Sequence, residues 1–354
     1  MNATDSSKQS AIRNESELIQ QFRQLIADEP DLRWQVPPGA PAREPLAWAR
    51  LKLDDRTRRF KPVYYLKPSI PELGSLVAGW KDPDPPLLVV PELSPRVLDF
   101  CRQKRLAAID LNGRAYVRAA GVLVDRRPLP GREFRFELEP RNVFVGVSAR
   151  IIRSLLTDRD RIWTQRDLLA RTKASSGLAS RIVQHLVRQG FIEKKSPWEF
   201  RVSDPLGLID AWAKADNFNR RTTTTRYTAF GGSPIEIAQQ LQAWAVGQSV
   251  SLAFTQWIAG WLRYPYTEPV VTSAYVTRPP ETAALERLGL RPVSDAGKVW
   301  LHVPDDVGVF LETQSVRDLA LVSDAQIYID LQNTGLRGSE QAAALRNWGG
   351  FCRK

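Results

Sequence analysis

The spacing of apolar residues between Ser148 and Gly190 constrains the fold of this chain more than any other feature. Three consecutive stretches place apolar side chains three or four positions apart, which is the spacing of an amphipathic helix. Ser148 and Thr164 suit the starts of the first two helices, Asp167 completes a capping box with Thr164, and Gly190 ends the third helix. The three stripes are Ile151, Ile152, Leu155 and Leu156; Leu168 and Leu169; and Leu178, Ile182, Val183, Leu186 and Val187. The sequence therefore predicts three successive helices.

A basic hairpin is expected directly after the third helix. The stretch FIEKKSPWEFRVSD, from Phe191 to Asp204, contains two runs of strand-forming residues on either side of Ser196 and Pro197. Three helices followed by such a hairpin are typical of a winged helix-turn-helix. We therefore expect a winged helix-turn-helix at about residues 143–203, and with it a protein that binds double-stranded DNA.

Positive charge is concentrated in the same part of the chain. The net charge is +11, and residues 141–226 alone hold 17 Lys and Arg against 8 Asp and Glu. A segment with this excess attracts polyanions. The alternative is a solvated basic surface that binds no partner, and the charge count alone does not decide between the two.

Two groups of side chains are predicted to contact DNA. The outward face of the third helix is expected to carry small or hydrogen-bonding residues, with Ala179 among them, that fit a major groove. Basic residues around that helix and on the hairpin are expected to contact phosphates. The predicted base-reading residues are Ser176, Ser180, Arg181 and Gln184, and the predicted phosphate-binding residues are Lys173, Lys194, Lys195 and Arg201. The alternative is a protein-docking module, which the neutral-to-basic outward face disfavours.

The length of 354 residues and the changes in pattern along the chain predict a multidomain fold of the α/β or α+β class. Within the first domain, Ser94 and Pro95 are expected to start a helix, and Asn112-Gly113 to form a hairpin turn. Ser233 and Pro234 are expected to start a helix in the last domain. The expected parts are a polar leader, short helix and Pro-rich linker at 1–45, a mixed α/β domain at 46–140, the winged helix-turn-helix at 141–219, a basic linker at 220–232 and a C-terminal α/β domain at 233–354.

Residues near the C-terminus carry a resemblance to a known family. The stretch LVSDAQIYIDLQNTGLRGSEQAAALRNW resembles the C-terminal signature of the AbiEi family, antitoxin-type transcriptional regulators of bacterial abortive-infection systems. The matching residues are Val322, Ser323, Gln326, Tyr328, Asp330, Leu331, Arg337, Gly338, Glu340 and Ala343. PELSPRVLDF and IDLNGRAYV resemble the N-terminal region of larger relatives, which implies a degenerate domain similar to restriction endonucleases. The resemblance covers most of residues 85–350.

The resemblance implies a function in a type IV toxin–antitoxin system. A member of this family represses its own operon and neutralises a toxin, commonly a nucleotidyltransferase, directly or indirectly. Many such antitoxins begin with the winged helix, whereas this chain begins with an additional α/β domain. A stand-alone regulator of a mobile element is equally compatible with the sequence.

Two interpretations of the C-terminal signature stay open. In the one that we favour, Ile327, Ile329 and Leu331 fill the core, while Asp330 and Arg337 form an ion pair within the fold. In the other, Asp330, Arg337 and Glu340 form a surface that faces a partner, which would require all three to be exposed.

The sequence contains no recognisable catalytic or metal-binding pattern. Asp110 lacks the second carboxylate and the Lys of a metal-dependent nuclease, so we expect it to cap the Asn112-Gly113 turn. A site assembled from Asp110 with Glu92 and Asp99 is the enzymatic alternative. His185 and His302 have no neighbouring ligand in the sequence. We expect no enzyme, no cofactor and no metal.

The remaining features concern the compartment. Cys101 and Cys352 are too few and too far apart for a disulfide framework, which fits a reducing environment. The first residues are polar, and no stretch is long and apolar enough for a membrane helix. We expect a cytoplasmic protein that is not associated with a membrane.

Overall fold

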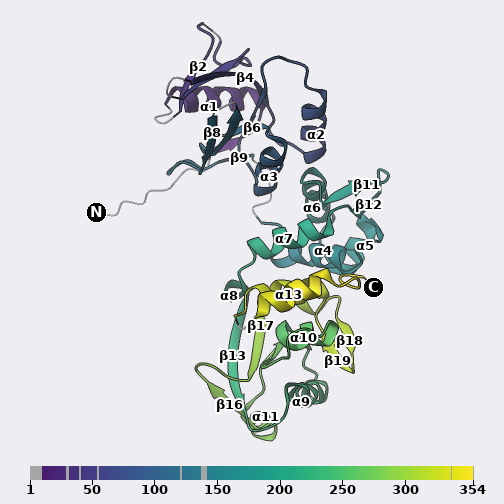
Figure 1. The fold of residues 1–354 in the computed structure, drawn as a ribbon. Coiled ribbons are helices and arrows are strands. Elements are labelled where there is room, and N and C mark those ends of the chain that lie inside the picture. Colours follow the sequence, from purple (N-terminus) through teal and green to yellow (C-terminus); the bar gives the residue numbers. More distant parts are fainter. Residues whose placement is uncertain are drawn as a thin grey trace, which may run out of the picture. The chain divides into compact units, whose positions relative to one another are not determined.

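The structure, a computed structural model, describes residues 10–28, 32–39, 41–53, 56–119, 122–136, 142–335 and 337–353. The chain divides into two compact units (Figure 1). The first contains residues 1–140 together with 185–190, and the second contains 141–184 and 191–354. Both contain helices and a mixed sheet, so the multidomain α/β fold is confirmed at this level. Within the described ranges, no helix has both the length and the apolar character needed to cross a bilayer.

The first unit is built on a seven-stranded sheet whose strands follow one another in sequence order. The pairs β4–β5 and β5–β6 are parallel, and the strands outside them pair antiparallel. The strands are β2 (Arg33–Gln35), β3 (Ala49–Leu53), β4 (Arg56–Tyr64), β5 (Pro86–Val90), β6 (Ala107–Asp110), β7 (Ala115–Ala119) and β8 (Val122–Arg126). A separate parallel pair consists of β1 (Ser10–Ile12) and β9 (Phe134–Phe136).

Helices cover the two faces of this sheet. α1 (Glu15–Ala27) packs on the side of Leu87, Val89 and Ile109. α2 (Ile70–Gly79) and α3 (Pro95–Lys104) pack on the side of Leu88 and Val90. Because alternate residues of a strand point to opposite faces, the two sets of helices lie on opposite sides of the sheet. The predicted helix start at Ser94 and Pro95 is confirmed.

The boundary predicted at residue 45 is wrong. Leu18, Phe22 and Leu25 of α1 are fully buried in the core of the α/β sheet, so the helix belongs to this domain rather than to a leader. β2, which pairs with β3, lies within the segment predicted as a Pro-rich linker. The prolines after residue 36 predict an extended connection, and such connections occur within domains as well as between them. They were therefore no evidence for a domain boundary.

The segment from 142 to 204 contains the three predicted helices and the predicted hairpin. These elements are α4 (Gly146–Thr157), α5 (Gln165–Thr172), α6 (Ser176–Arg188), β11 (Ile192–Lys194) and β12 (Glu199–Val202). A short strand that the sequence analysis missed, β10 (Ile162–Thr164), pairs with β12 to form an antiparallel sheet in the order β10–β12–β11. The capping box of Thr164 with Asp167 is confirmed. The expected cap at Ser148 is wrong, since Val145 is the N-cap and Ser148 lies inside α4.

The rest of the second unit is a seven-stranded sheet in the order β16–β13–β17–β15–β14–β19–β18. Helices α9 and α10 both contact β14 and β15, and α12 packs against α10, α13, α4 and α7. The strands are β13 (Thr222–Ala229), β14 (Leu252–Thr255), β15 (Thr272–Val276), β16 (Leu290–Val293), β17 (Val299–Pro304), β18 (Gln314–Val316) and β19 (Leu319–Leu321). The helices are α7 (Pro205–Ala215), α8 (Phe218–Arg221), α9 (Pro234–Gly247), α10 (Gln256–Arg263), α11 (Thr282–Arg287), the 3-10 helix η1 (Val307–Phe310), α12 (Asp324–Gln332) and α13 (Gly338–Asn347).

The basic linker predicted at 220–232 is wrong. Its threonines form β13, which lies inside the sheet between β16 and β17. Threonine is β-branched and favours strands, so the run is a strand signal although its composition is simple. The helix predicted to start at Ser233 and Pro234 is confirmed as α9, where Glu236 completes a capping box.

Candidate nucleic-acid interface

The outward face of α6 presents most of the residues that the sequence predicted. Ser176, Arg181 and Gln184 are exposed and Ser180 is half-buried. The predicted inward residues Ile182 and Leu186 are fully buried. Ala179 is also fully buried, so its predicted place on the outward face is wrong. The helix contains no acidic residue along its length.

Hydrogen bonds tie two of these residues to their neighbours. Gln165 of α5 donates through Nε2 to the Ser176 carbonyl at 2.9 Å and to Ser176 Oγ at 3.1 Å. Gln184 Nε2 donates to Ser180 Oγ at 3.3 Å. The first contact fixes the start of α6 against α5, and the second holds the Gln184 amide along the outward face.

Lys173 occupies the turn between α5 and α6. It caps the C-terminus of α5 with a φ of 55°, and its amide donates to the Leu169 carbonyl. Its side chain is exposed. A non-glycine residue in the left-handed region closes the helix and turns the chain toward α6. Lys173 is therefore available beside the start of the outward face.

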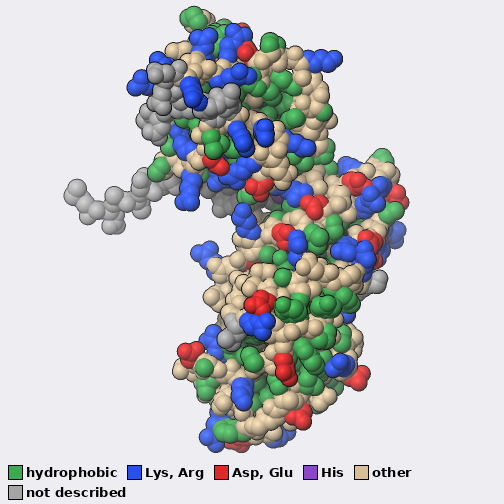
Figure 2. All heavy atoms as spheres, in the orientation of Figure 1, with side chains coloured by type: hydrophobic (Ala, Val, Ile, Leu, Met, Phe, Trp, Pro, Cys, Tyr) green, Lys and Arg blue, Asp and Glu red, His purple; other side chains and the backbone are tan. Residues whose placement is uncertain are grey.

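The hairpin carries the other predicted basic residues, but two of them share an acidic partner. Lys194, Lys195 and Arg201 are exposed. Lys195 Nζ lies 2.5 Å from a Glu193 carboxylate oxygen, and Arg201 Nε pairs with the same oxygen. The bonds from Lys195 and Arg201 hold the pKa of Glu193 below its usual range. Figure 2 accordingly shows blue and red side chains together over β11 and β12. The sequence analysis missed this pairing, although the register of the hairpin places Glu193 opposite Arg201.

An exposed aromatic residue at the turn of the hairpin was also missed. Trp198 is 81% exposed, the most exposed large apolar side chain among the described residues. Ser196 Oγ accepts hydrogen bonds from the amides of Trp198 and Glu199, which fixes the turn. A tryptophan in this position can stack on a base or cover a sugar.

α4 faces the C-terminal sheet domain instead of solvent. Arg153 is buried, donates to Gln326 Oε1 from Nε and Nη2, and donates to the Gly308 carbonyl from Nη1. Burial lowers the Arg153 pKa to about 10, so the side chain stays charged at neutral pH. Arg150 pairs with Asp306 at 2.9 Å. These contacts join α4 to α12 and η1.

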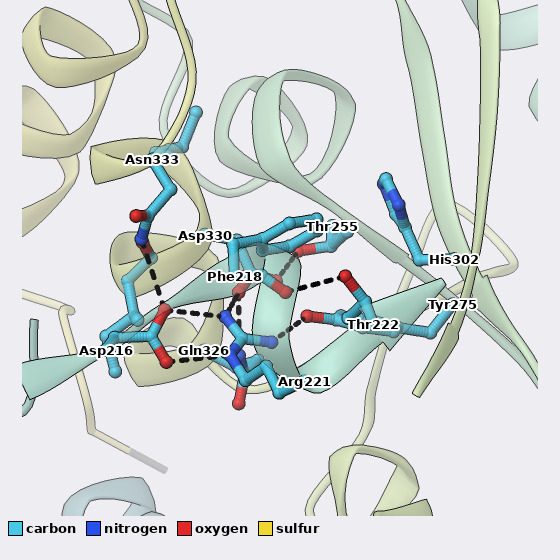
Figure 3. Close-up of polar contacts among 12 residues, drawn as sticks. Asp216, Phe218, Arg221, Thr222, Thr255, Tyr275, His302, Gln326, Asp330 and Asn333 are labelled. Atoms are coloured by element: carbon cyan, nitrogen blue, oxygen red, sulfur yellow. Dashed lines mark hydrogen bonds and ion pairs between the residues drawn. The ribbon is translucent and has the colours of Figure 1, made fainter. Parts of the chain in front are cut away.

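The C-terminal signature residue Asp330 lies in a buried polar network (Figure 3). It accepts hydrogen bonds from Arg221 Nη2 at 2.6 Å, from Gln326 Nε2 at 2.7 Å and from the Thr255 hydroxyl. Both interpretations of Asp330 are therefore wrong: it is not exposed to a partner, and its ionic partner is Arg221 rather than Arg337. Ile327, Ile329 and Leu331 are buried as expected.

Arg337 and Glu340 form an ion pair of their own. Arg337 Nε lies 2.6 Å from a Glu340 carboxylate oxygen, and both side chains are exposed. The contact spans one turn, from the residue before α13 into its first turn. Of the three residues considered for a partner-facing surface, these two are accessible.

Asp110 has a structural role. Its carboxylate accepts hydrogen bonds from the amides of Leu93 and Arg114, both at 2.9 Å, which confirms that it caps the turn at Asn112-Gly113. Burial raises its pKa to about 6. Asp99 pairs with Arg102 on the exposed side of α3. In the described ranges, no cluster of three or more His, Cys, Asp or Glu side chains could hold a metal ion.

No family model, curated protein or solved structure matches the chain.

Proposed function

We propose that residues 143–203 form a winged helix-turn-helix and that the protein is a sequence-specific, double-stranded DNA-binding transcriptional regulator. The observation that carries the proposal is the outward face of α6, which is exposed and free of acidic residues. A recognition helix must enter the negative potential of the major groove, so an outward face without carboxylates favours this contact.

The arrangement of the segment supports this proposal. α5 and α6 are joined by a three-residue turn, and the hairpin β11–β12 follows α6 directly. In winged helix-turn-helix proteins the second helix of such a pair enters the major groove while other elements contact the backbone. α6 would then read base edges through Ser176, Ser180, Arg181 and Gln184. Lys173, Lys194, Lys195 and Arg201 would contact phosphates.

Binding to a labelled fragment of the region upstream of the gene, against a scrambled fragment, tests the proposal. Arg181→Ala is expected to relax preference at one base pair by about 1–3 kcal/mol, because a guanidinium can make two hydrogen bonds to guanine. Lys194→Ala is expected to weaken binding to both fragments alike and to lower the salt slope by roughly one. Equal retention of both fragments by the unaltered protein, or the same loss on every sequence for both variants, would contradict the proposal.

The pairing of Glu193 gives a second prediction. Glu193→Gln removes the carboxylate that Lys195 and Arg201 share, so both cations become available to phosphate. We expect tighter binding to native and scrambled fragments by on the order of 1 kcal/mol, with a steeper salt dependence. Fluorescence anisotropy at several salt concentrations measures both quantities.

Glu199→Gln is the matched control, since it removes the same charge from the same hairpin. The Glu199 carboxylate accepts a hydrogen bond from the Ser196 hydroxyl at 3.3 Å rather than pairing with a cation. Glu199→Gln is expected to give a smaller gain in DNA affinity than Glu193→Gln. Equal gains for the two variants would mean that general charge, and not release of Lys195 and Arg201, controls affinity.

The antitoxin function implied by the AbiEi resemblance is a narrower proposal. It rests on the C-terminal signature, of which Arg337 and Glu340 are exposed and could meet a toxin. The degenerate restriction-endonuclease-like character of the first domain is likewise a proposal, which the mixed sheet with helices on both faces allows.

A further inference from the structure

One face of the strands β2, β3 and β4 in the first unit carries a row of cations. The register of β2 with β3 places Arg33 beside Lys52, and that of β3 with β4 places Arg50 beside Arg59. Lys61 follows two residues after Arg59 on the same face. We call these five residues the basic sheet face: Arg33, Arg50, Lys52, Arg59 and Lys61. Arg50 is half-buried and the other four are exposed.

This face is opposite to the one that packs on α1. Ala49, Leu51 and Phe60, which alternate with the cations, are buried in the core cluster that contains α1. Val63 continues the cationic row and is paired with Leu88, which faces α2 and α3. The basic sheet face is therefore the part of that side on which the strands stay exposed. Figure 2 shows mainly blue charged side chains over the part of the first unit where Figure 1 places β2 and β4.

The placement of these cations side by side destabilises the sheet. Like charges directly opposite each other on neighbouring strands destabilise a sheet, and this face holds two such pairs, Arg33 with Lys52 and Arg50 with Arg59. Part of the charge is balanced, because Asp84 pairs with Arg59 and Asp82 pairs with Lys61 at 2.6 Å. The strands themselves contribute five cations and no acidic side chain to the described face. A polyanion would relieve the repulsion.

An aromatic ring orients two of the cations. The Arg50 and Arg59 guanidinium carbons lie 5.2 Å and 5.9 Å from the centre of the Trp48 ring. A ring at this distance attracts both cations and restrains them near the surface of the sheet. Both groups are thereby held in place before any ligand arrives.

Protection of the sheet edge is the alternative explanation of this charge. Basic residues on an edge strand prevent pairing with other chains, and β2 is the edge of this sheet. However, four of the five cations lie on β3 and β4, which are interior strands with partners on both sides. Edge protection accounts for Arg33 but does not require the others.

We propose that the basic sheet face binds the phosphodiester backbone of duplex DNA. Same-face residues are about 7 Å apart along a strand and neighbouring strands about 5 Å apart, so a single backbone can meet several cations at once. Such contacts strengthen binding without reading sequence. The inference rests on the proposed function in taking duplex DNA as the ligand, and it adds a second contact surface in the other unit.

The salt dependence of binding to a scrambled duplex, measured with the full chain, tests this inference. Arg33→Ala with Lys52→Ala removes two exposed cations that face each other, and each lost phosphate contact lowers the slope by roughly 0.9. A slope reduced by nearly two is expected. Arg278→Ala with Arg287→Ala is the matched control, because it removes the same charge from exposed positions of the C-terminal sheet domain and is expected to leave the slope unchanged.

The outcomes separate this inference from the proposed function. A slope equal to that of the unaltered protein, an equal fall in the control, or an effect confined to single-stranded DNA would overturn the inference. Preference for the upstream fragment over the scrambled one is measured on the same proteins and reports on α6 alone. If that preference is absent while the double variant still lowers the salt slope, only the proposed function is contradicted. Because the double alanine variant loses a like-charge pair, its thermal unfolding midpoint should not be lower than that of the unaltered protein. If the midpoint is lower, Arg33→Gln with Lys52→Gln repeats the test with polar side chains.

Discussion

Replacing Arg221 with Met is expected to lower the free energy of unfolding of the second unit by about 3–5 kcal/mol. Arg221 makes a two-pronged contact with Asp216, at 2.7 Å and 3.0 Å, and also donates to Asp330 and to the Tyr275 hydroxyl (Figure 3). The side chains of Asp216 and Asp330 are 2% and 0% exposed. Without Arg221 two buried charges lose their cation and repel each other.

Arg220→Met is the matched control for this change. Arg220 is the neighbouring residue of α8, is exposed, and is expected to tolerate the substitution with a change within about 0.5 kcal/mol. Arg221→Lys keeps the charge but loses the planar fork, so it should fall between the two. Urea denaturation followed by tryptophan fluorescence measures the three variants. Equal stability of Arg221→Met and Arg220→Met would show that the network does not stabilise the fold.

Local rules in the sequence identified most helix starts and turns correctly. The capping box at Thr164 and Asp167 and the turn at Asn112-Gly113 each depend on residues within four positions of one another. Ser94-Pro95 and Ser233-Pro234 likewise start helices where the sequence predicts them. Such signals act through backbone groups close by in the chain, so the rest of the fold hardly alters them.

Contacts between distant residues could not be predicted in the same way. The partner of Asp330 is Arg221, which is 109 positions away, whereas Arg337 is close in sequence but pairs with Glu340. No local spacing distinguishes these choices, because the sheet and α12 together bring Asp330 to Arg221. The same reason explains β13, whose place between two strands is a property of the whole sheet.

The sequence predicted only part of the candidate interface correctly. Helical spacing was enough to place Arg181 and Gln184 on the outward face of α6. It misplaced Ala179, a residue small enough to suit either face. The ion pairs of Glu193 were within reach of the sequence, since the hairpin register around Ser196 follows from the turn, but the charge count treated Lys195 and Arg201 as free cations.

The second large effect is expected from lowering the pH, and it centres on His302. This residue is buried; its Nδ1 lies 2.8 Å from the Thr224 hydroxyl, and the Phe218 ring packs edge-on against it with centres 4.9 Å apart. Burial, followed by repulsion from Arg221 and Arg226, lowers the pKa of His302 to about 3. The fold therefore holds the imidazole in its neutral form.

Stability should fall as the solution is acidified because the unfolded chain binds a proton that the folded protein excludes. The ordinary histidine pKa of about 6.5 marks where this loss begins, and the loss continues down to the folded value near 3. Above pH 6.5 both states are neutral and His302 contributes no pH dependence. Between pH 6.5 and pH 4 the expected loss from this residue is about 3 kcal/mol.

His302→Asn isolates this contribution from that of the carboxylates, which also titrate in this range. Asparagine carries a polar atom near the position of Nδ1 and takes up no proton, so the difference in unfolding free energy between the unaltered protein and the variant should shrink by that amount as the pH falls. The opposite outcome is a difference in unfolding free energy between the two proteins that stays constant from pH 6.5 to pH 4. It would mean that His302 is protonated as readily in the folded protein as in the unfolded chain. The site would then open to water far more easily than its packing against Phe218 implies.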